Sequence, residues 1–324
     1  MKKILITGAT GFLGNYLLEA FSGPEFNVTA LCRSTPPSGM QKKGVTYVEG
    51  DIEDPSAMTG VFNNIDIVIH AAALVSIKPE DNQRMYAVNV LGTRNVVNAA
   101  LESGVKRLIH ISSVAAIGGG RSNSKILNES AVWSGPSEGY GFTKYHAELE
   151  IFRAAAEGTE IDIINPSVIV APAGQNRSSG LLLKLARSRF SFVPEGIVNI
   201  IDARDVSDFI LEMTGRSASG QRYILNGFTL TWNDFFREVS QRTGKSVKHL
   251  TIPTPLALGF TAIQEFIFFI LMRPPVLTRV AVKMATSGNR YSTEKLTSET
   301  GFCFRRAENT LDWICGNPPV SGHV

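Results

Sequence analysis

The chain has 324 residues, of which 44% are hydrophobic and 19% are charged, and its formal net charge is +3. This length is enough for about two domains with a sizeable buried core. The basic residues are scattered, so no nucleic-acid-binding footprint is present. The three cysteines, Cys32, Cys303 and Cys315, are odd in number and lack C-x-x-C spacing. They argue against a disulfide framework and a zinc site, and they fit a reducing, cytoplasmic location.

Two apolar stretches bear on the possibility of a membrane protein. The N-terminal run at residues 4–6 is too short for a secretory signal peptide. Residues 256–273 are strongly apolar but contain Gln264, Glu265 and Arg273. Because a spanning helix needs about 20 predominantly apolar residues, we expect a buried or interfacial helix there and no transmembrane span. Peripheral membrane contact is the less favoured alternative.

The first half of the chain alternates between short apolar runs and helical stretches. Strands are predicted at residues 2–7, 26–33, 45–51, 66–73, 106–114 and 161–167, and helices at residues 12–23, 55–64, 90–104 and 143–158. Strands that alternate with helices indicate βαβ units, and hence a parallel sheet with helices on both faces. The run at residues 66–73 is apolar without alternation, as is typical of a strand covered on both faces.

The alternation breaks after Pro166. Residues 198–202 and 222–227 are interpreted as strands that return to the main sheet, and the chain beyond them is mostly helical. We therefore predict an α/β fold, with a Rossmann-type doubly wound parallel sheet and a smaller, mostly helical C-terminal domain that binds the substrate. The predicted boundaries are residues 1–166 with returns near 197–226 for the first domain, and residues 167–196 and 227–324 for the discontinuous second domain.

A glycine-rich turn lies between the first predicted strand and the first predicted helix. Its glycines are spaced G-x-x-G-x-x-G. Glycine permits the tight turn and lets backbone N–H groups approach a pyrophosphate, while the helix N-terminus supplies partial positive charge. In this context the pattern predicts a dinucleotide-binding loop. Its candidate cofactor-binding residues are Gly8, Thr10, Gly11, Phe12, Leu13 and Gly14.

The end of the second predicted strand indicates which dinucleotide is preferred. NAD-binding folds usually carry Asp or Glu at this point to hold the ribose 2′-hydroxyl, whereas a nearby arginine accommodates a 2′-phosphate. This chain has Cys32 at the position where the acidic residue is expected, and Arg33 follows it. A guanidinium matches the geometry of a phosphate. We therefore predict NADP as the preferred cofactor and NAD as the alternative.

Tyr140 and Lys144 are separated by one helical turn, so both side chains lie on the same face of a helix. An unperturbed phenol has a pKa of about 10, and a neighbouring ammonium favours the phenolate and lowers that value. General acid–base catalysis works best when the pKa lies near the working pH. The pair is therefore interpreted as a catalytic acid and the cation that tunes it.

Together these motifs resemble those of the extended short-chain dehydrogenases/reductases, a family of sugar-nucleotide epimerases, dehydratases and dihydroflavonol-4-reductase-like enzymes. The resemblance covers nearly the whole chain. Its segments are TGATGFLG, GDIED, HAAA, NVLGTRNVVNAA, ISSVAAIG, YGFTK, INPSVIVAP and DARDVSDFI. The segment INPSVIVAP and the C-terminal PPVLTR…YSTEKLTSETGF are more similar to the dihydroflavonol-reductase-like and 3β-hydroxysteroid-dehydrogenase-like branch than to the epimerases.

The resemblance also implies roles for individual residues. Lys144 would hold the nicotinamide ribose in addition to tuning Tyr140, and Ser113 would bind and polarise the substrate oxygen. The helices that follow Leu91 and Thr143 resemble those of a dimeric four-helix interface, which implies a homodimer. The remaining implied cofactor contacts are Asp51 and Ile52 at the adenine, Ala71, Ala72 and Ala73 along the phosphates and ribose, and Pro166 and Ser167 at the nicotinamide carboxamide.

These observations favour an NAD(P)-dependent oxidoreductase that acts on a carbonyl or secondary alcohol of a bulky small molecule. Hydride would pass from the nicotinamide to a carbonyl carbon while Tyr140 protonates the oxygen and Ser113 polarises it. Two alternatives stay open. One is a nucleotide-sugar epimerase or dehydratase with tightly bound NAD, and the other is an NADP-sensing regulator without enzymatic activity. The glycine- and serine-rich stretch at residues 117–139 departs from the family pattern and leaves the substrate undetermined.

Several other polar residues are interpreted as structural. His70 and His110 lie in predicted buried strands, where we expect them to be packed rather than to bind a ligand. His146 and Glu148 are expected to face solvent or a subunit contact. Asp205 is the predicted N-cap of a helix. No metal site is predicted.

Overall fold

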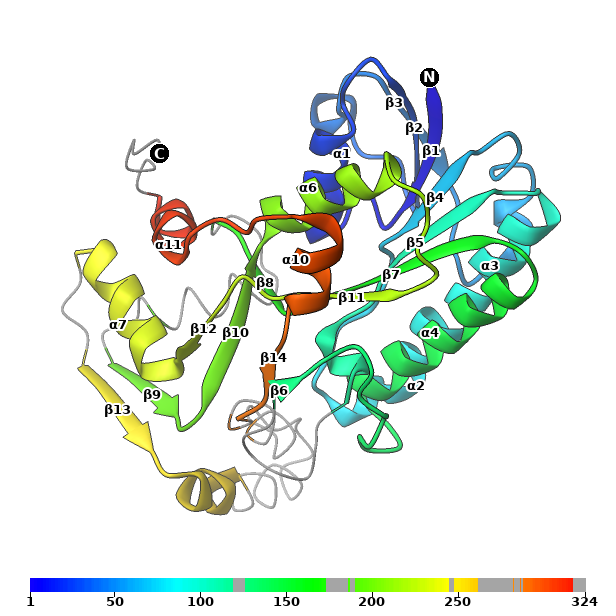
Figure 1. Ribbon diagram of the computed structural model, residues 1–324. Helices are drawn as coiled ribbons and strands as arrows, with labels where there is room; N and C mark the ends of the chain where they lie inside the picture. The colour runs from blue at the N-terminus through cyan, green and yellow to red at the C-terminus, as the bar shows by residue number, and fades with distance from the viewer. Residues whose placement is uncertain are drawn as a thin grey trace.

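The computed structural model describes residues 1–118, 126–172, 186, 190–244, 248–261, 282, 286 and 288–316. Its larger part is a sheet with helices on both faces, and its smaller part contains the later segments of the chain (Figure 1). Within the described residues, no helix is both long enough and apolar enough to cross a membrane. Most of the apolar stretch at residues 256–273 lies outside the described residues.

A seven-stranded parallel sheet forms the larger part, in the order β11-β7-β5-β4-β1-β2-β3. This doubly wound arrangement confirms the predicted fold class. The strand order reverses between β1 and β4, which is where open α/β sheets bind ligands beyond the carboxyl ends of their strands. The strands are β1 (Lys2–Thr7), β2 (Phe26–Cys32), β3 (Val45–Glu49), β4 (Ile67–His70), β5 (Arg107–Ile111), β7 (Glu160–Pro166) and β11 (Arg222–Leu225).

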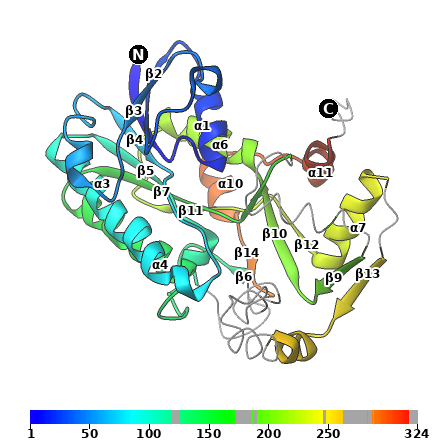
Figure 2. The ribbon, with the colours of Figure 1, turned by 180° about the vertical axis from the view of Figure 1, so that it is seen from behind.

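Two hydrophobic cores cover the two faces of the sheet. Successive residues of β1 alternate between them, so that Ile4 and Ile6 lie in one core and Leu5 in the other. Helices α1 and α6 cover the first face and α3 and α4 the second, as the two opposite views show (Figures 1 and 2). These helices are α1 (Phe12–Ala20), α3 (Gly92–Glu102), α4 (Tyr140–Ala156) and α6 (Ala203–Thr214).

Two predicted helices differ from the structure. The helix predicted at residues 55–64 is wrong beyond its first turn, since only the 3₁₀ helix η2 (Pro55–Met58) forms. Gly60 and Asn64 adopt positive φ angles of 77° and 58°, which an α-helix does not accept. The helix predicted from residue 90 is preceded without a break by α2 (Asn82–Tyr86) and a π-helical turn, η4 (Ala87–Leu91).

The smaller part contains short strands as well as helices. The predicted return of residues 222–227 to the main sheet is confirmed, because β11 pairs with β7. The predicted return of residues 198–202 is wrong: β10 (Ile197–Asp202) instead pairs with β8 (Val168–Val170) and β12 (Phe228–Thr231). β8 follows β7 after one residue, so it offers β10 a new edge away from the main sheet.

The remaining elements complete the smaller part and its connections to the sheet. β13 pairs with β9, and β14 pairs with β6. These elements are β6 (Ile126–Leu127), β9 (Phe190–Pro194), β13 (Lys248–Ile252), β14 (Arg290–Tyr291), α7 (Trp232–Arg242), α10 (Glu294–Thr300) and α11 (Ala307–Cys315).

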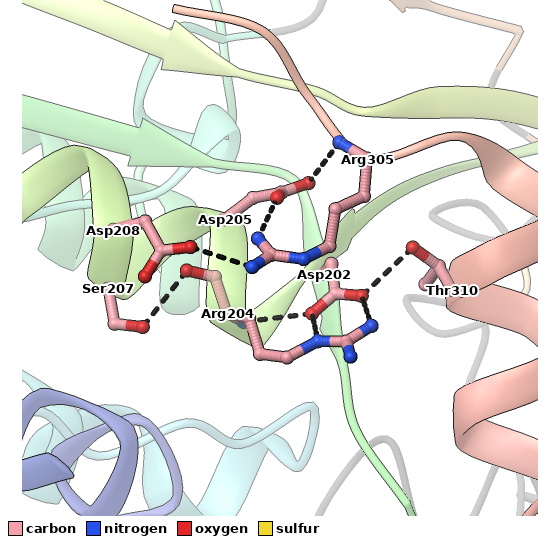
Figure 3. Close-up of polar contacts among 7 residues, drawn as sticks. All are labelled: Asp202, Arg204, Asp205, Ser207, Asp208, Arg305 and Thr310. Carbon is pink, nitrogen blue, oxygen red and sulfur yellow. Dashed lines mark hydrogen bonds and ion pairs between the residues drawn. The ribbon is translucent and has the colours of Figure 1, made fainter. Parts of the chain in front are cut away.

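A cluster of charged residues ties the C-terminal segment to helix α6 (Figure 3). Asp202 caps the helix by accepting a hydrogen bond from the Arg204 backbone N–H at 2.8 Å, and the Thr310 hydroxyl donates to the same carboxylate at 2.9 Å. The prediction that Asp205 is the cap is therefore wrong. Asp205 instead pairs with Arg305 at 2.5 Å, and Arg305 also binds Asp208. The cluster is structural, as the sequence suggested.

Candidate active site

The glycine loop brings the ends of β1 and β4 into close contact. Gly8 has a φ of +70°, and a Cβ atom there would lie 2.6 Å from the backbone nitrogen of Ala72. A Cβ atom on Gly14 would lie 2.3 Å from the carbonyl oxygen of Gly8. Helix α1 then begins after Gly11 with no side-chain cap. Its first backbone N–H groups are donors that an anion such as a pyrophosphate would use, and Gly8 and Gly14 admit no larger residue.

The other candidate cofactor residues follow the carboxyl ends of neighbouring strands. Ala71, Ala72 and Ala73 follow β4, and Asp51 and Ile52 follow β3. The carboxyl ends of parallel strands meet at one edge of the sheet, so these positions lie along the same edge as the glycine loop. The loop residues Thr10, Phe12 and Leu13 are at this edge as well, together with Pro166 and Ser167 at the end of β7. The contacts of these residues with a cofactor stay predictions.

Arg33 is exposed just beyond β2, and the structure places an acidic residue near it that sequence reasoning missed. Glu49 on β3 lies opposite Cys32 in the sheet register. Its carboxylate accepts a hydrogen bond from the Thr35 backbone N–H at 2.8 Å, and this bond holds the Glu49 pKa below its usual range. An ionised carboxylate is therefore close to the proposed 2′-phosphate position. Arg33 and Glu49 are 16 positions apart in sequence, so only the pairing of β2 with β3 shows that they are near each other.

A buried row of polar groups runs from β1 into the helices. His70 shares one hydrogen bond with the Thr7 hydroxyl at 2.7 Å and another with the Thr93 hydroxyl at 2.9 Å. Its ring lies 5.1 Å from that of His110. Both histidines are fully buried, which confirms their predicted packing. Burial and, to a smaller extent, the Lys144 charge together lower the His70 pKa to about 3, and burial holds the His110 pKa well below its usual value. Both rings are thus neutral at physiological pH.

Lys144 ends this row. Its ammonium donates a hydrogen bond to the Ile111 carbonyl oxygen at 2.7 Å and lies 3.4 Å from His110 Nε2. The side chain is 1% exposed. Burial lowers the Lys144 pKa to about 8, while the negative charge of Glu148 acts in the opposite direction. Because an ammonium can only donate hydrogen bonds, His110 Nε2 is the acceptor in the second contact, consistent with a neutral imidazole.

Tyr140 and Ser113 meet at the start of helix α4. Tyr140 is the first residue of the helix, and Ser113 caps the short 3₁₀ helix η5 (Val114–Ala116) directly after β5. Burial raises the Tyr140 pKa to about 12, and a hydrogen bond with the Ser113 side chain partly offsets this increase. The expectation of a lowered pKa is therefore wrong for the protein without cofactor. A protonated phenol beside a hydroxyl is suited to donate a proton.

Sequence reasoning did not assign a role to Asn89, which fixes the position of helix α4. Its side chain accepts from the Leu74 N–H at 2.7 Å and donates to the Leu74 carbonyl at 2.9 Å. It also donates to the Thr143 hydroxyl at 3.0 Å, which in turn donates to the Tyr140 carbonyl at 2.8 Å. Asn89 thus joins the loop after β4 to the catalytic helix. Asn89 belongs to the NVLGT segment of the family resemblance, but the π-helical turn that orients its side chain could not be predicted from the sequence.

The expectation that Glu148 faces solvent or a subunit contact is wrong. Its side chain is fully buried, two helical turns beyond Tyr140. It lies 2.9 Å from Arg222 on β11 and accepts a hydrogen bond from Asn165 on β7 at 2.6 Å. The sequence did not indicate this because both partners come from distant segments. Within the described part of the chain, no group of three or more His, Cys, Asp or Glu residues could hold a metal ion.

Comparison with known proteins places this geometry in context. Residues 4–222 match the sequence model of the NAD dependent epimerase/dehydratase family. A Synechocystis protein with the provisional name dihydroflavonol 4-reductase is 31% identical, over 91% of this chain and 88% of that protein. Sterol demethylase protein B of Methylococcus capsulatus is 28% identical, over 92% of each. The crystal structure of gox2253 superposes with a TM-score of 0.83 and 27% identity, over 98% of this chain and 97% of that one.

Burial of Lys144 should reduce the stability of the fold at neutral pH. The folded pKa of about 8 is below that of an unfolded lysine, about 10.4, so the cost is fully present below pH 8 and is relieved as the pH rises toward 10.4. This shift is worth about 3 kcal/mol and the lost hydrogen bond about 1 kcal/mol. Lys144→Met should therefore raise the free energy of unfolding in urea by about 2 kcal/mol at pH 7.

The gain should shrink when the same measurement is made at pH 10. Lys106→Met, which removes an exposed lysine, should change the free energy of unfolding by less than about 0.5 kcal/mol at both pH values. If Lys144→Met changed the free energy of unfolding equally at pH 7 and pH 10, burial of the Lys144 charge would not be what destabilises the fold.

Proposed function

Since the chain belongs to the NAD dependent epimerase/dehydratase family, and is therefore an enzyme that works with a nicotinamide dinucleotide, we propose that it reduces a carbonyl, or oxidises the corresponding secondary alcohol, on a bulky small molecule. The observation that carries this proposal is the Ser113–Tyr140 hydroxyl pair, which meets at the start of α4. Lys144, which is buried, lies one turn further along the same helix. The names of the two relatives, a reductase and a sterol demethylase protein, support a bulky substrate.

The chain's own groups have separate roles in this proposal. The loop from Gly8 to Gly14 and the N-terminus of α1 would hold the pyrophosphate, because α1 begins without a side-chain cap and its first N–H groups are donors for an anion. When bound, the nicotinamide supplies or accepts the hydride at the substrate carbon. Lys144 would contribute to holding the nicotinamide ribose, but its shown contacts are with Ile111 and His110.

Proton transfer falls to Tyr140. The phenol is protonated at neutral pH, since its pKa of about 12 is well above 7. It can donate this proton to the substrate oxygen as negative charge develops there and makes that oxygen more basic. The Ser113 hydroxyl would donate to the same oxygen and stabilise that charge. The positive charge of Lys144, one turn along the helix, stabilises the phenolate that remains. The oxidation direction uses the same groups in reverse.

Replacement of the phenol tests this assignment. Tyr140→Phe should lower kcat by about 10²–10⁴-fold, the usual contribution of a positioned general acid, with the dissociation constant for NADPH unchanged. Tyr145→Phe is the matched control, because it lies on the same helix and keeps the ring that stacks on Trp133. Turnover would be followed as NADPH oxidation over a panel of cyclic and steroidal ketones.

Two results would count against the proposal. Near-wild-type turnover by the Tyr140→Phe variant would remove Tyr140 from the chemistry. Conversion of a nucleotide sugar without added cofactor would identify an epimerase, which the family name also permits. In that case the same residues would act on tightly bound NAD.

The preference for NADP over NAD is proposed from the charges at the end of β2. Arg33 is exposed there and can pair with a 2′-phosphate, whereas Glu49 would repel it. The KM for NADPH should be lower than that for NADH. Arg33→Gln should raise the KM for NADPH about tenfold or more, as expected for the loss of a charge-assisted contact, and Glu49→Gln should lower it. A clear preference of the wild-type enzyme for NADH would contradict this proposal.

The homodimer is proposed from the faces of α3 and α4. These helices lie side by side on one face of the sheet, and Leu149 on α4 and Tyr86 on α2 are 43% and 39% exposed. Light scattering should give twice the chain mass of 35.2 kDa, and Leu149→Glu should shift the protein toward the monomer. An unchanged dimer in that variant would exclude this face. The odd number of cysteines and their lack of C-x-x-C spacing support the proposed cytoplasmic location.

A further inference from the structure

Glu148 is a buried carboxylate to which the proposed proton transfer assigns no role. It lies one turn beyond Lys144 on α4, so Tyr140, Lys144 and Glu148 recur at intervals of four residues on one face of the helix. Its side chain is fully buried. A buried carboxylate is costly unless it is paired, and burial does raise the Glu148 pKa. A hydrophobic residue would be cheaper at this position.

The partner that offsets this cost comes from the edge strand of the sheet. Arg222 on β11 places its Nε atom 2.9 Å from Glu148 Oε2, and the arginine side chain is only 15% exposed. The guanidinium charge acts to lower the Glu148 pKa, against burial. Because arginine stays protonated in proteins, this pairing favours the ionised form of Glu148.

Asn165 connects this carboxylate to Ser113. Its side-chain nitrogen donates to Glu148 Oε1 at 2.6 Å and to the Ser113 carbonyl oxygen at 2.9 Å. Both neighbours are acceptors, so the NH₂ group of Asn165 must face them and the orientation of the amide is fixed. Asn165 itself is fully buried. The main chain of Ser113, whose hydroxyl meets Tyr140, is therefore held by an amide that Glu148 orients.

The charge of Glu148 also acts on Lys144. The described titratable groups around Lys144 are His110 on β5, His70 on β4, and Tyr140 and Glu148 on α4. The two histidines are buried and neutral, and Tyr140 is protonated at neutral pH. Among these groups Glu148 is the one whose negative charge raises the pKa of Lys144 against the effect of burial.

We propose that Glu148 is a positioning residue of the active site, which orients Ser113 through Asn165 and keeps the Lys144 ammonium charged through its own negative charge. This inference rests on the proposed function, in which Ser113 and charged Lys144 support proton donation by Tyr140. The Arg222 side chain is the third member, because it keeps Glu148 ionised.

Two substitutions separate the two effects. Glu148→Gln keeps the length and an oxygen that accepts from Asn165 but removes the charge, so the pKa of Lys144 should fall by about one unit or more. Glu148→Asp keeps the charge and shortens the reach, so the Lys144 pKa should stay near its wild-type value while kcat falls and the dissociation constant for NADPH does not change. The Lys144 pKa would be followed by ¹³C NMR of lysine-labelled protein, with Lys144→Met used for assignment.

Activity supplies a second readout. For any ketone that the wild-type enzyme reduces, the high-pH decline of kcat should begin at lower pH in the Glu148→Gln variant than in the wild type. Glu150→Gln is the control, because Glu150 lies on the same helix but pairs with Arg153 at its outer face. It should leave the Lys144 pKa and the pH profile unchanged.

The pKa readout needs no substrate, so it distinguishes failure of this inference from failure of the proposed function. An unchanged Lys144 pKa in Glu148→Gln would overturn the charge role, and an unchanged kcat in Glu148→Asp would overturn the orienting role. If Glu148→Gln does not fold, Arg222→Gln decides the first point. Loss of the Arg222 charge should raise the Glu148 pKa further, and the Lys144 pKa should then fall in the same direction as in Glu148→Gln.

Discussion

The buried charge of Lys144 is the constraint on which the site depends. Lys144 is 1% exposed, so its charge requires hydrogen-bond partners inside the protein. These partners are the main chain of β5 and a neutral histidine. That histidine stays neutral because it is itself buried beside a positive charge. In the polar row from Thr7 to Lys144, both imidazoles are therefore neutral, and Lys144 at the end of the row is the cation.

The sheet makes this arrangement possible by bringing the ends of distant strands together. Thr7, His70 and His110 come from β1, β4 and β5, which are adjacent in the sheet although they are far apart in sequence. The close approach of Gly8 to Ala72 fixes the distance between β1 and β4 at the point where strand order reverses. The glycine loop and the start of α4 thus lie at one edge of the sheet, and Asn89 joins the loop after β4 to α4.

Much of the site could be predicted because it is encoded locally. The glycine spacing defines a turn between a strand and a helix, and the Tyr140–Lys144 spacing defines a helical face; neither needs the rest of the chain. The fold class followed from the alternation of apolar runs and helices. Predictions failed where long-range contacts decide the outcome. Glu148 looked like a surface residue because its partners, Asn165 and Arg222, lie 17 and 74 positions away, and β10 joined β8 because that edge was open.

The sequence alone determined the parallel sheet, the glycine turn after β1 and the helical face that Tyr140 and Lys144 share, because each of these depends on spacings within one turn or one βα unit. The tertiary structure decided the ionisation of those residues. The burial of Tyr140 raises its pKa where the local pattern suggested the opposite. Strand pairing brings Glu49 next to the end of β2, and packing brings Glu148 next to Arg222 and Asn165. Desolvation and charge proximity arise only when distant segments come together, so they cannot be read from local spacing.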